Sequence, residues 1–129
     1  MSAIIDMKAR KTEEIDIYSP ELLALAEFLE CDPEDISEES YDYYGMTLFS
    51  YGSAEYAVAD DDTANSAWDM SLESYIDECI IPELPENMVN YFDNEAWKRD
   101  AQCDGRGLSL SPYDGEENAQ GDYFIYRTN

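Results

Sequence analysis

The stretch YYGMTLFSYGSAEYAVA, residues 43–59, decides the fold of this 129-residue chain. Residues 43–50 and 54–59 are rich in aromatic and β-prone side chains, and Tyr51-Gly52-Ser53 between them has the composition of a turn. The pattern therefore predicts a β-hairpin. Because the apolar runs are longer than strict alternation would give, we expect at least one of its strands to be well covered.

A second β-prone run, YFIYR at residues 123–127, predicts a last strand that is added to this hairpin. Before the hairpin, Ser19-Pro20-Glu21 is typical of a helix start, with an N-cap serine and a proline in the first turn. Apolar residues then recur with helical spacing, and we expect the helix to end near Cys31 because Pro33 follows. Pro33-Glu34-Asp35-Ile36 predicts a short further turn, and the acidic residues 37–42 should be exposed.

After the hairpin, Asp60-Asp61-Asp62-Thr63 predicts the cap and acidic first turn of the chain's strongest helix, over residues 62–81. The spacing predicts one buried face on that helix, made of Trp68, Leu72, Tyr75, Ile76 and Cys79. Two short helices are expected at residues 86–91 and 94–103, and residues 108–121 should be mostly loop. The fold class is therefore predicted as α+β: a single domain over residues 1–129, with residues 1–15 flexible and a small, about three-stranded antiparallel sheet carrying helices on one face.

Charge is the most unusual property of the chain. Thirty-one Asp and Glu face seven Lys and Arg, a formal net charge of −24. A small domain is comfortable at a net charge of roughly 2–8 units, and charge far beyond that destabilises the compact state by self-repulsion. Between Thr12 and Trp97 there are 24 acidic residues and no Lys or Arg. A surface that served solubility alone would mix the two signs.

Acidity of this kind also has three causes that need no cationic partner protein: a solvated surface kept for solubility, adaptation to high salt, and calcium binding. An EF-hand loop needs a glycine at position six and a glutamate at position twelve. Counted from Asp60, these positions hold Asn65 and Ser71, so a helix cap accounts better for the three aspartates.

The residues that we expect to bind a partner are carboxylates in rows. On the helix over residues 62–81, Asp69, Glu73 and Asp77 recur every four residues, ~6 Å apart along the axis. With no basic residue at i±4, neighbours in this row should repel and lower helix stability slightly. Several such rows together could imitate the phosphates that DNA-binding proteins meet with Lys and Arg. The predicted partner-binding residues are Asp60, Asp61, Asp62, Asp69, Glu73, Asp77, Glu38, Glu39 and Asp42.

Catalysis is not indicated. The chain has no histidine, which excludes Ser-His-Asp and Cys-His catalysis and the usual zinc sites. No Walker loop or complete GxGxxG motif is present, since Gly105-Arg106-Gly107 is only the first half of the latter and follows no predicted strand, and among 31 carboxylates any close pair is expected by chance. We therefore expect no enzyme, no cofactor and no metal site. Three widely spaced cysteines, no signal peptide and no apolar run of spanning length predict a cytoplasmic location.

The stretch Tyr91-Phe92-Asp93-Asn94-Glu95-Ala96-Trp97-Lys98-Arg99-Asp100 resembles the Y-[FI]-D-x-E-A-x-x-R-D segment of ArdA-type antirestriction proteins. The region from residue 43 onward is also similar to small acidic proteins of prophages and mobile elements. ArdA-type proteins mimic bent DNA and occupy the DNA groove of type I restriction enzymes. The resemblance covers about ten residues, and it implies a phage- or mobile-element-encoded inhibitor.

These observations support two hypotheses of function, and an enzyme that works without histidine is a third alternative. In the first, the protein mimics nucleic acid and binds the cationic DNA- or RNA-binding site of a host defence complex, either a restriction enzyme or a CRISPR effector. In the second, it is a regulatory module that binds proteins through an aromatic surface (Tyr41, Tyr43, Tyr44, Tyr91), and its charge serves solubility. Neither involves direct binding to nucleic acid or to a membrane, and both leave a homodimer open.

Overall fold

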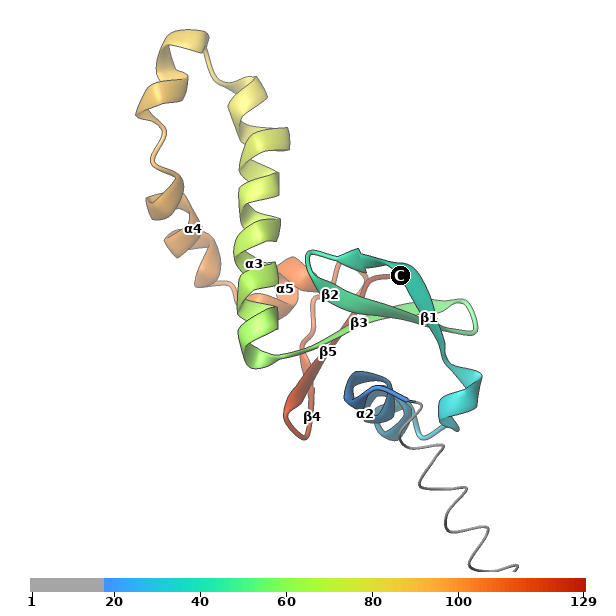
Figure 1. Cartoon of the computed structure of the whole chain (residues 1–129). Coiled ribbons are helices and arrows are strands. Elements are labelled where there is room, and N and C mark those ends of the chain that lie inside the picture. Colours follow the sequence, from blue (N-terminus) through green and yellow to red (C-terminus); the bar gives the residue numbers. More distant parts are fainter. Residues whose placement is uncertain (1–17) are drawn as a thin grey trace, which may run out of the picture.

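The computed structural model describes residues 18–129 (Figure 1). The segment expected to be flexible, residues 1–15, lies outside the described residues. Within residues 18–129, none of the helices has both the length and the apolar composition needed to cross a bilayer.

The centre of the fold is an antiparallel sheet of five strands in the order β1-β2-β3-β5-β4. The strands are β1 (Ser37–Tyr43), β2 (Met46–Tyr51), β3 (Ala54–Asp60), β4 (Asn118–Gln120) and β5 (Tyr123–Arg127). The α+β class, the hairpin β2–β3 and the added strand β5 are confirmed. The expected three strands were too few, because β1 reads as an acidic surface segment and β4 is three residues long.

Two tight turns fix the register of the first three strands. Tyr43 pairs with Met46 across the β1–β2 turn, and both turn residues, Tyr44 and Gly45, have positive φ values of 53° and 89°. Gly52, at φ 61°, plays the same part in the β2–β3 turn. Two-residue hairpin turns favour this left-handed backbone because its twist matches that of the strands. Tyr44 is therefore held in a conformation that few non-glycine residues adopt.

The sheet is covered on both faces, which corrects the expectation of helices on one face. The segment α2 (Pro20–Leu29) covers the first face, where Leu25, Phe49, Val58 and Ile125 are all within 1% of complete burial. The second face is covered by α3 (Asp61–Tyr75) and α5 (Arg106–Leu110). Because β3 contributes Tyr56 and Val58 to one core and Ala57 and Ala59 to the other, its sequence is apolar throughout.

The predicted start of α2 is confirmed by its capping hydrogen bond. Ser19 Oγ accepts a hydrogen bond from the Leu22 amide at 3.1 Å, and Pro20 occupies the first helical position. The helix ends where Glu30 enters the left-handed region at φ 56°. A single 3₁₀ turn, η1 (Pro33–Asp35), then leads into β1 as the prolines predict.

The region expected to be mostly loop, residues 108–121, contains part of α5 and all of β4. The segment α5 packs against α3 and β5, and Leu110 is fully buried. Gly107 lets α5 lie against the segment that leads into β4, since a Cβ atom built there would lie 2.7 Å from the Glu117 amide nitrogen. Pro112, Gly115 and Gly121, which indicated a loop, therefore follow a short helix that closes the second core.

Candidate protein-binding surface

A helical limb projects from the sheet and forms the most distinctive surface of the molecule (Figure 1). Its outward arm is α3, continued by the π-helical turn η2 (Ile76–Ile80) and the 3₁₀ turn η3 (Ile81–Glu83). Its return arm is the 3₁₀ segment η4 (Glu86–Tyr91) and α4 (Asn94–Gln102). Pro82 and Pro85 lie at the tip, where each limits helical continuation. The two short helices predicted here are confirmed.

The limb begins at the predicted cap. Asp60 Oδ1 accepts a hydrogen bond from the Thr63 amide at 2.8 Å, and this hydrogen bond lowers the pKa of the Asp60 carboxyl. Asp61 and Asp62 follow in the first turn, where negative charge meets the positive end of the helix dipole.

The predicted buried face of α3 is correct only in part. Leu72 and Ile76 are buried, but Tyr75 is 51% exposed and Cys79 is exposed. The residues that pack on the sheet are instead Ala64 and Ala67, which face Ala57 and Ala59 in the second core. The reason is the direction of α3: its first half lies on the sheet, and its second half extends beyond it. Small side chains let the first half approach the sheet closely.

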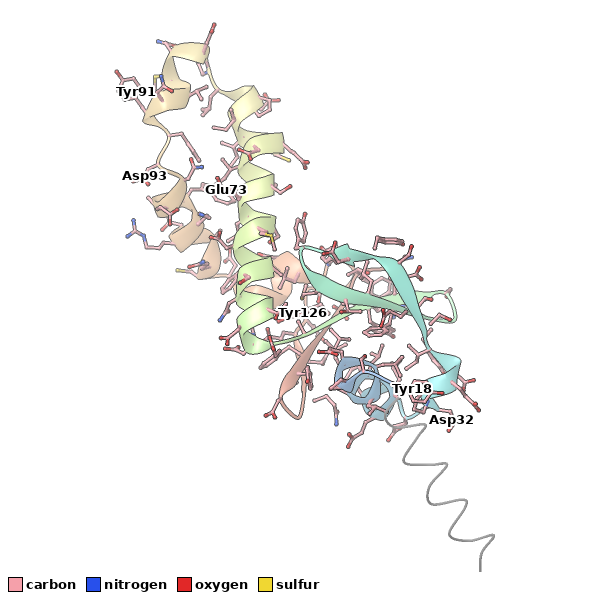
Figure 2. The ribbon with its side chains drawn as sticks, in the orientation of Figure 1. Tyr18, Asp32, Glu73, Tyr91, Asp93 and Tyr126 are labelled. Atoms are coloured by element: carbon pink, nitrogen blue, oxygen red, sulfur yellow. The ribbon has the colours of Figure 1, made fainter. Side chains whose placement is uncertain are left out.

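The structure brings a cation to the carboxylate row, which the sequence had placed without countercharge. Lys98 of α4 lies 2.9 Å from Asp69, 3.0 Å from Glu73 and 3.2 Å from Glu95. Figure 2 shows Glu73 on the side of α3 that faces α4. Asn94 donates a further hydrogen bond to Glu73 at 3.0 Å.

Lys98 is therefore a structural cation. Its side chain is 8% exposed, and hydrogen bonds to Asp69 and then Glu73 raise its pKa well above the ordinary lysine value. Two of the predicted partner-binding residues, Asp69 and Glu73, thus hold the two arms of the limb together. This corrects the expectation that the carboxylates of the row only repel one another. Asp77 is exposed and, within residues 18–129, is the member of the row that has no ion pair.

A second cation, Arg106, sits at the base of the limb. Its guanidinium pairs with Asp61 at 3.0 Å, donates a hydrogen bond to Asn65 at 2.8 Å and lies 4.6 Å above the Phe124 ring. It also pairs with Glu117, which accepts a hydrogen bond from the buried Tyr126 hydroxyl. The network ties α3 and α5 to the sheet, so Asp61 also has a structural role.

The remaining predicted carboxylates lie on β1, which forms one edge of the sheet. Glu38 and Asp42 are exposed and Glu39 is half-buried, and the pairing with β2 is irregular between Glu38 and Asp42. Charged side chains and irregular pairing on an edge strand also discourage edge-to-edge association. The nine predicted residues therefore fall on β1 and along the outward arm of the limb, from the cap residue Asp60 through α3 to Asp77 in η2, and do not form one continuous row.

The uncompensated charge is a property of the whole surface. None of the acidic side chains in residues 18–129 is buried, and the half-buried ones are Glu21, Glu39, Glu55 and Glu73. Of the cations in the same residues, Lys98 and Arg106 are held by carboxylates, and Arg127 lies 3.7 Å from the centre of the Tyr113 ring. Arg99 is exposed. In this part of the chain, residues 18–129, the positive charges are mostly used within the fold, and the negative charges face solvent.

The limb also bounds a groove of about 520 Å³ that the sequence did not predict. Tyr75 of α3 and Trp97 of α4 line it with their rings stacked, 5.5 Å apart and 8° from parallel. Leu72 and Leu108 add apolar surface. The helical spacing of Tyr75 indicated burial. It could not indicate a groove, because the opposite wall is formed by α4, which lies elsewhere in the sequence.

The expected aromatic surface is dispersed. Tyr91 lies at the tip of the limb and is 81% exposed, whereas Tyr41 lies on β1 (Figures 1 and 2). Tyr43 and Tyr44 are half-buried and contact each other edge to face at 4.8 Å. These four tyrosines do not make one patch.

No group of three or more His, Cys, Asp or Glu within residues 18–129 is arranged to hold a metal ion. Comparison with known protein families, curated proteins and solved structures gave no match to this chain.

Proposed function

We propose that the protein is a stoichiometric inhibitor, encoded by a phage or mobile element, that mimics nucleic acid. It acts in the cytoplasm of a bacterial host, without catalysis, by binding the cationic DNA- or RNA-binding site of a defence complex. The target is a restriction enzyme or a CRISPR effector.

The observation that carries this proposal is that, within residues 18–129, cations form ion pairs inside the fold while the carboxylates face solvent. Lys98 and Arg106 are consumed by internal ion pairs, while every acidic side chain in residues 18–129 keeps some or most of its surface in solvent. Self-repulsion on this scale costs stability, so a surface of one sign calls for a reason beyond solubility. A site built to bind phosphates would meet these carboxylates with the same Lys and Arg side chains.

The shape of the limb also supports the proposal. The limb extends away from the sheet (Figure 1) and carries exposed acidic residues along its length: Asp62 in α3, Asp77 in η2, Glu83 in η3 and Glu86 in η4. A narrow projection of this kind suits a channel or groove that normally admits a nucleic-acid strand. The ArdA-like segment, residues 91–100, forms the end of η4 and most of α4, on the return arm.

Competition tests the proposal directly. The purified protein would be titrated into a type I restriction enzyme and into a DNA-targeting CRISPR effector, with release of labelled DNA as the readout. We expect stoichiometric displacement of DNA and an affinity that falls steeply as salt rises. No displacement from any nucleic-acid-binding defence complex, at low salt and micromolar protein, would contradict mimicry.

Variants that remove exposed carboxylates test whether inhibition depends on charge or only on the shape of the protein. Asp62→Asn with Asp77→Asn on the limb, and Glu38→Gln with Asp42→Asn on β1, remove exposed charges that have no ion pair within residues 18–129. The matched controls exchange the same residues for the opposite acid, Asp→Glu and Glu→Asp, and keep every charge. We expect inhibition to fall in the neutral variants and to persist in the controls.

Exposure at the tip favours a second candidate function. Tyr91 is 81% exposed and Met88 49% exposed, which suits contact with a protein partner. In that case the protein is a regulatory module whose charge serves solubility. Binding that is insensitive to salt and is lost in Tyr91→Ala would favour this candidate over mimicry.

A further inference from the structure

The groove between the two arms of the limb holds negative charge that the fold does not neutralise. Glu78 of η2 and Asp104, just after α4, both line it and are exposed. No basic residue lines the groove, and within residues 18–129 neither carboxylate takes part in an ion pair. Lys98 does not neutralise the groove, because its partners Asp69 and Glu73 lie outside the groove lining.

The groove walls are partly aromatic and are joined to one another by side-chain contacts. The Tyr75–Trp97 stack joins α3 to α4. Trp68 Nε1 donates a hydrogen bond to Ser109 Oγ at 3.0 Å and so joins α3 to α5. Tyr44, from the strained β1–β2 turn, completes the lining. A ligand would thus meet ring surface that is already positioned, beside two exposed carboxylates.

We infer that this groove receives an arginine side chain of the cationic partner, between the Tyr75–Trp97 rings and the carboxylates of Glu78 and Asp104. A guanidinium is planar and weakly hydrated, stacks on aromatic rings and pairs with carboxylates in a fork geometry. Lysine lacks the planar fork, and an uncharged apolar side chain would leave both carboxylates unpaired. This inference rests on the proposed function in that the arginine belongs to the nucleic-acid-binding site of the target.

The groove can be tested without knowing the target. The probe is the blocked peptide Gly-Arg-Gly, compared with the same peptide carrying citrulline, which has the shape of arginine without its charge. The readout is the indole N–H signal of Trp97 in an NMR titration of the ¹⁵N-labelled full chain, with the backbone amides of α2, on the other face of the sheet, as internal reference. We expect the arginine peptide to shift the Trp97 signal in a saturable manner and the citrulline peptide to leave it nearly unchanged.

Two double variants of equal charge separate the groove from general attraction to a −24 protein. Glu78→Gln with Asp104→Asn removes the groove carboxylates. Glu34→Gln with Asp35→Asn, on the exposed turn η1 beside α2, removes the same charge elsewhere. We expect the first variant to weaken arginine-peptide binding about tenfold and the second to change it less than about twofold. Melting temperatures of both variants verify that the fold is intact.

The outcomes distinguish this inference from the proposed function. Equal responses to arginine and citrulline, or equal losses in the two double variants, would overturn the arginine groove. If a defence complex is bound and Glu78→Gln with Asp104→Asn binds it as tightly as the Glu34/Asp35 control, the groove fails and the proposed function stands. If no complex is bound but Trp97 responds selectively to arginine, the groove stands and mimicry fails.

Discussion

Lys98 Nζ lies 2.9 Å from Asp69 Oδ1, across the interface between the two arms of the limb. The two residues are 29 positions apart in the sequence, and the lysine is the first basic residue after Lys11. Asp69 is 58% exposed at its side chain while Lys98 is 8% exposed, so the pair presents its negative partner to solvent. The fold therefore uses one cation to position several carboxylates without covering them.

Removing that cation should loosen the limb. We expect Lys98→Met to lower the free energy of unfolding by roughly 1–3 kcal/mol, the range for losing hydrogen bonds to charged groups. Amide hydrogen exchange in α4 should also become faster. The control is Arg99→Met, the exposed neighbour, which should change neither quantity much. Unchanged exchange in α4 after Lys98→Met would show that apolar contacts alone hold the arms together.

The carboxylates of the row should respond differently to neutralisation. Asp69→Asn with Glu73→Gln removes two partners of Lys98, so we expect a lower melting temperature. Asp77→Asn removes an exposed charge without an ion pair within residues 18–129, and should leave the melting temperature level or raise it slightly. The sequence alone predicts a level or higher melting temperature when all three carboxylates are neutralised. A rise for Asp69→Asn with Glu73→Gln would mean that repulsion outweighs the ion pairs.

Tyr126 gives stability a dependence on alkaline pH. Burial, followed by the hydrogen bond to Glu117, raises the pKa of the Tyr126 hydroxyl far above its ordinary value of about 10. The pKa of Tyr126 is therefore higher in the folded chain than in the unfolded chain. Its contribution to the free energy of unfolding is fully present below about pH 10 and is lost as pH rises beyond that value. Chemical denaturation from pH 7 to 11 should show wild type more stable than Tyr126→Phe at neutral pH, with the difference shrinking above pH 10. Tyr113→Phe, at an exposed ring, is the control and should track wild type.

Gly107 should not tolerate a larger residue. A Cβ atom there would lie 2.7 to 2.9 Å from three backbone atoms of residues 115–117. Since backbone yields less easily than a side chain, we expect Gly107→Ala to destabilise the fold by roughly 1–3 kcal/mol. Leu108→Ala, at a position 59% exposed, is the neighbouring control and should have little effect on the melting temperature. Equal melting temperatures for the two variants would mean that α5 can shift to accommodate the methyl group.

The hydrogen bond between Trp68 and Ser109 can be measured by a double-mutant cycle. Trp68→Phe keeps a ring but removes the indole donor, and Ser109→Ala removes the acceptor. We expect each change alone to cost roughly 0.5–1.5 kcal/mol and the double variant to cost less than their sum. Strict additivity would show that the hydrogen bond does not contribute to joining α3 and α5.

The sequence by itself determined the features whose causes are local. Ser19 and Asp60 cap helices through hydrogen bonds to amides three residues later, and turn residues such as Gly52 fix a hairpin through their own backbone angles. The strands β2, β3 and β5 could be predicted because apolar side chains on both faces leave a continuous signal. The strand β1 could not, since an exposed edge has no core to bury and its acidic residues read as surface.

Tertiary structure alone decided where the charges and the aromatic rings meet. Lys98 and Arg106 lie late in a chain whose middle is acidic, and their partners depend on how the limb folds back and how α5 docks. Tyr75 likewise changes from an expected core residue to a groove wall because α3 extends past the sheet and Trp97 returns beside it. Helical periodicity says which residues share a face. It does not say whether that face meets a sheet, another helix or solvent, because that depends on contacts between segments far apart in the sequence.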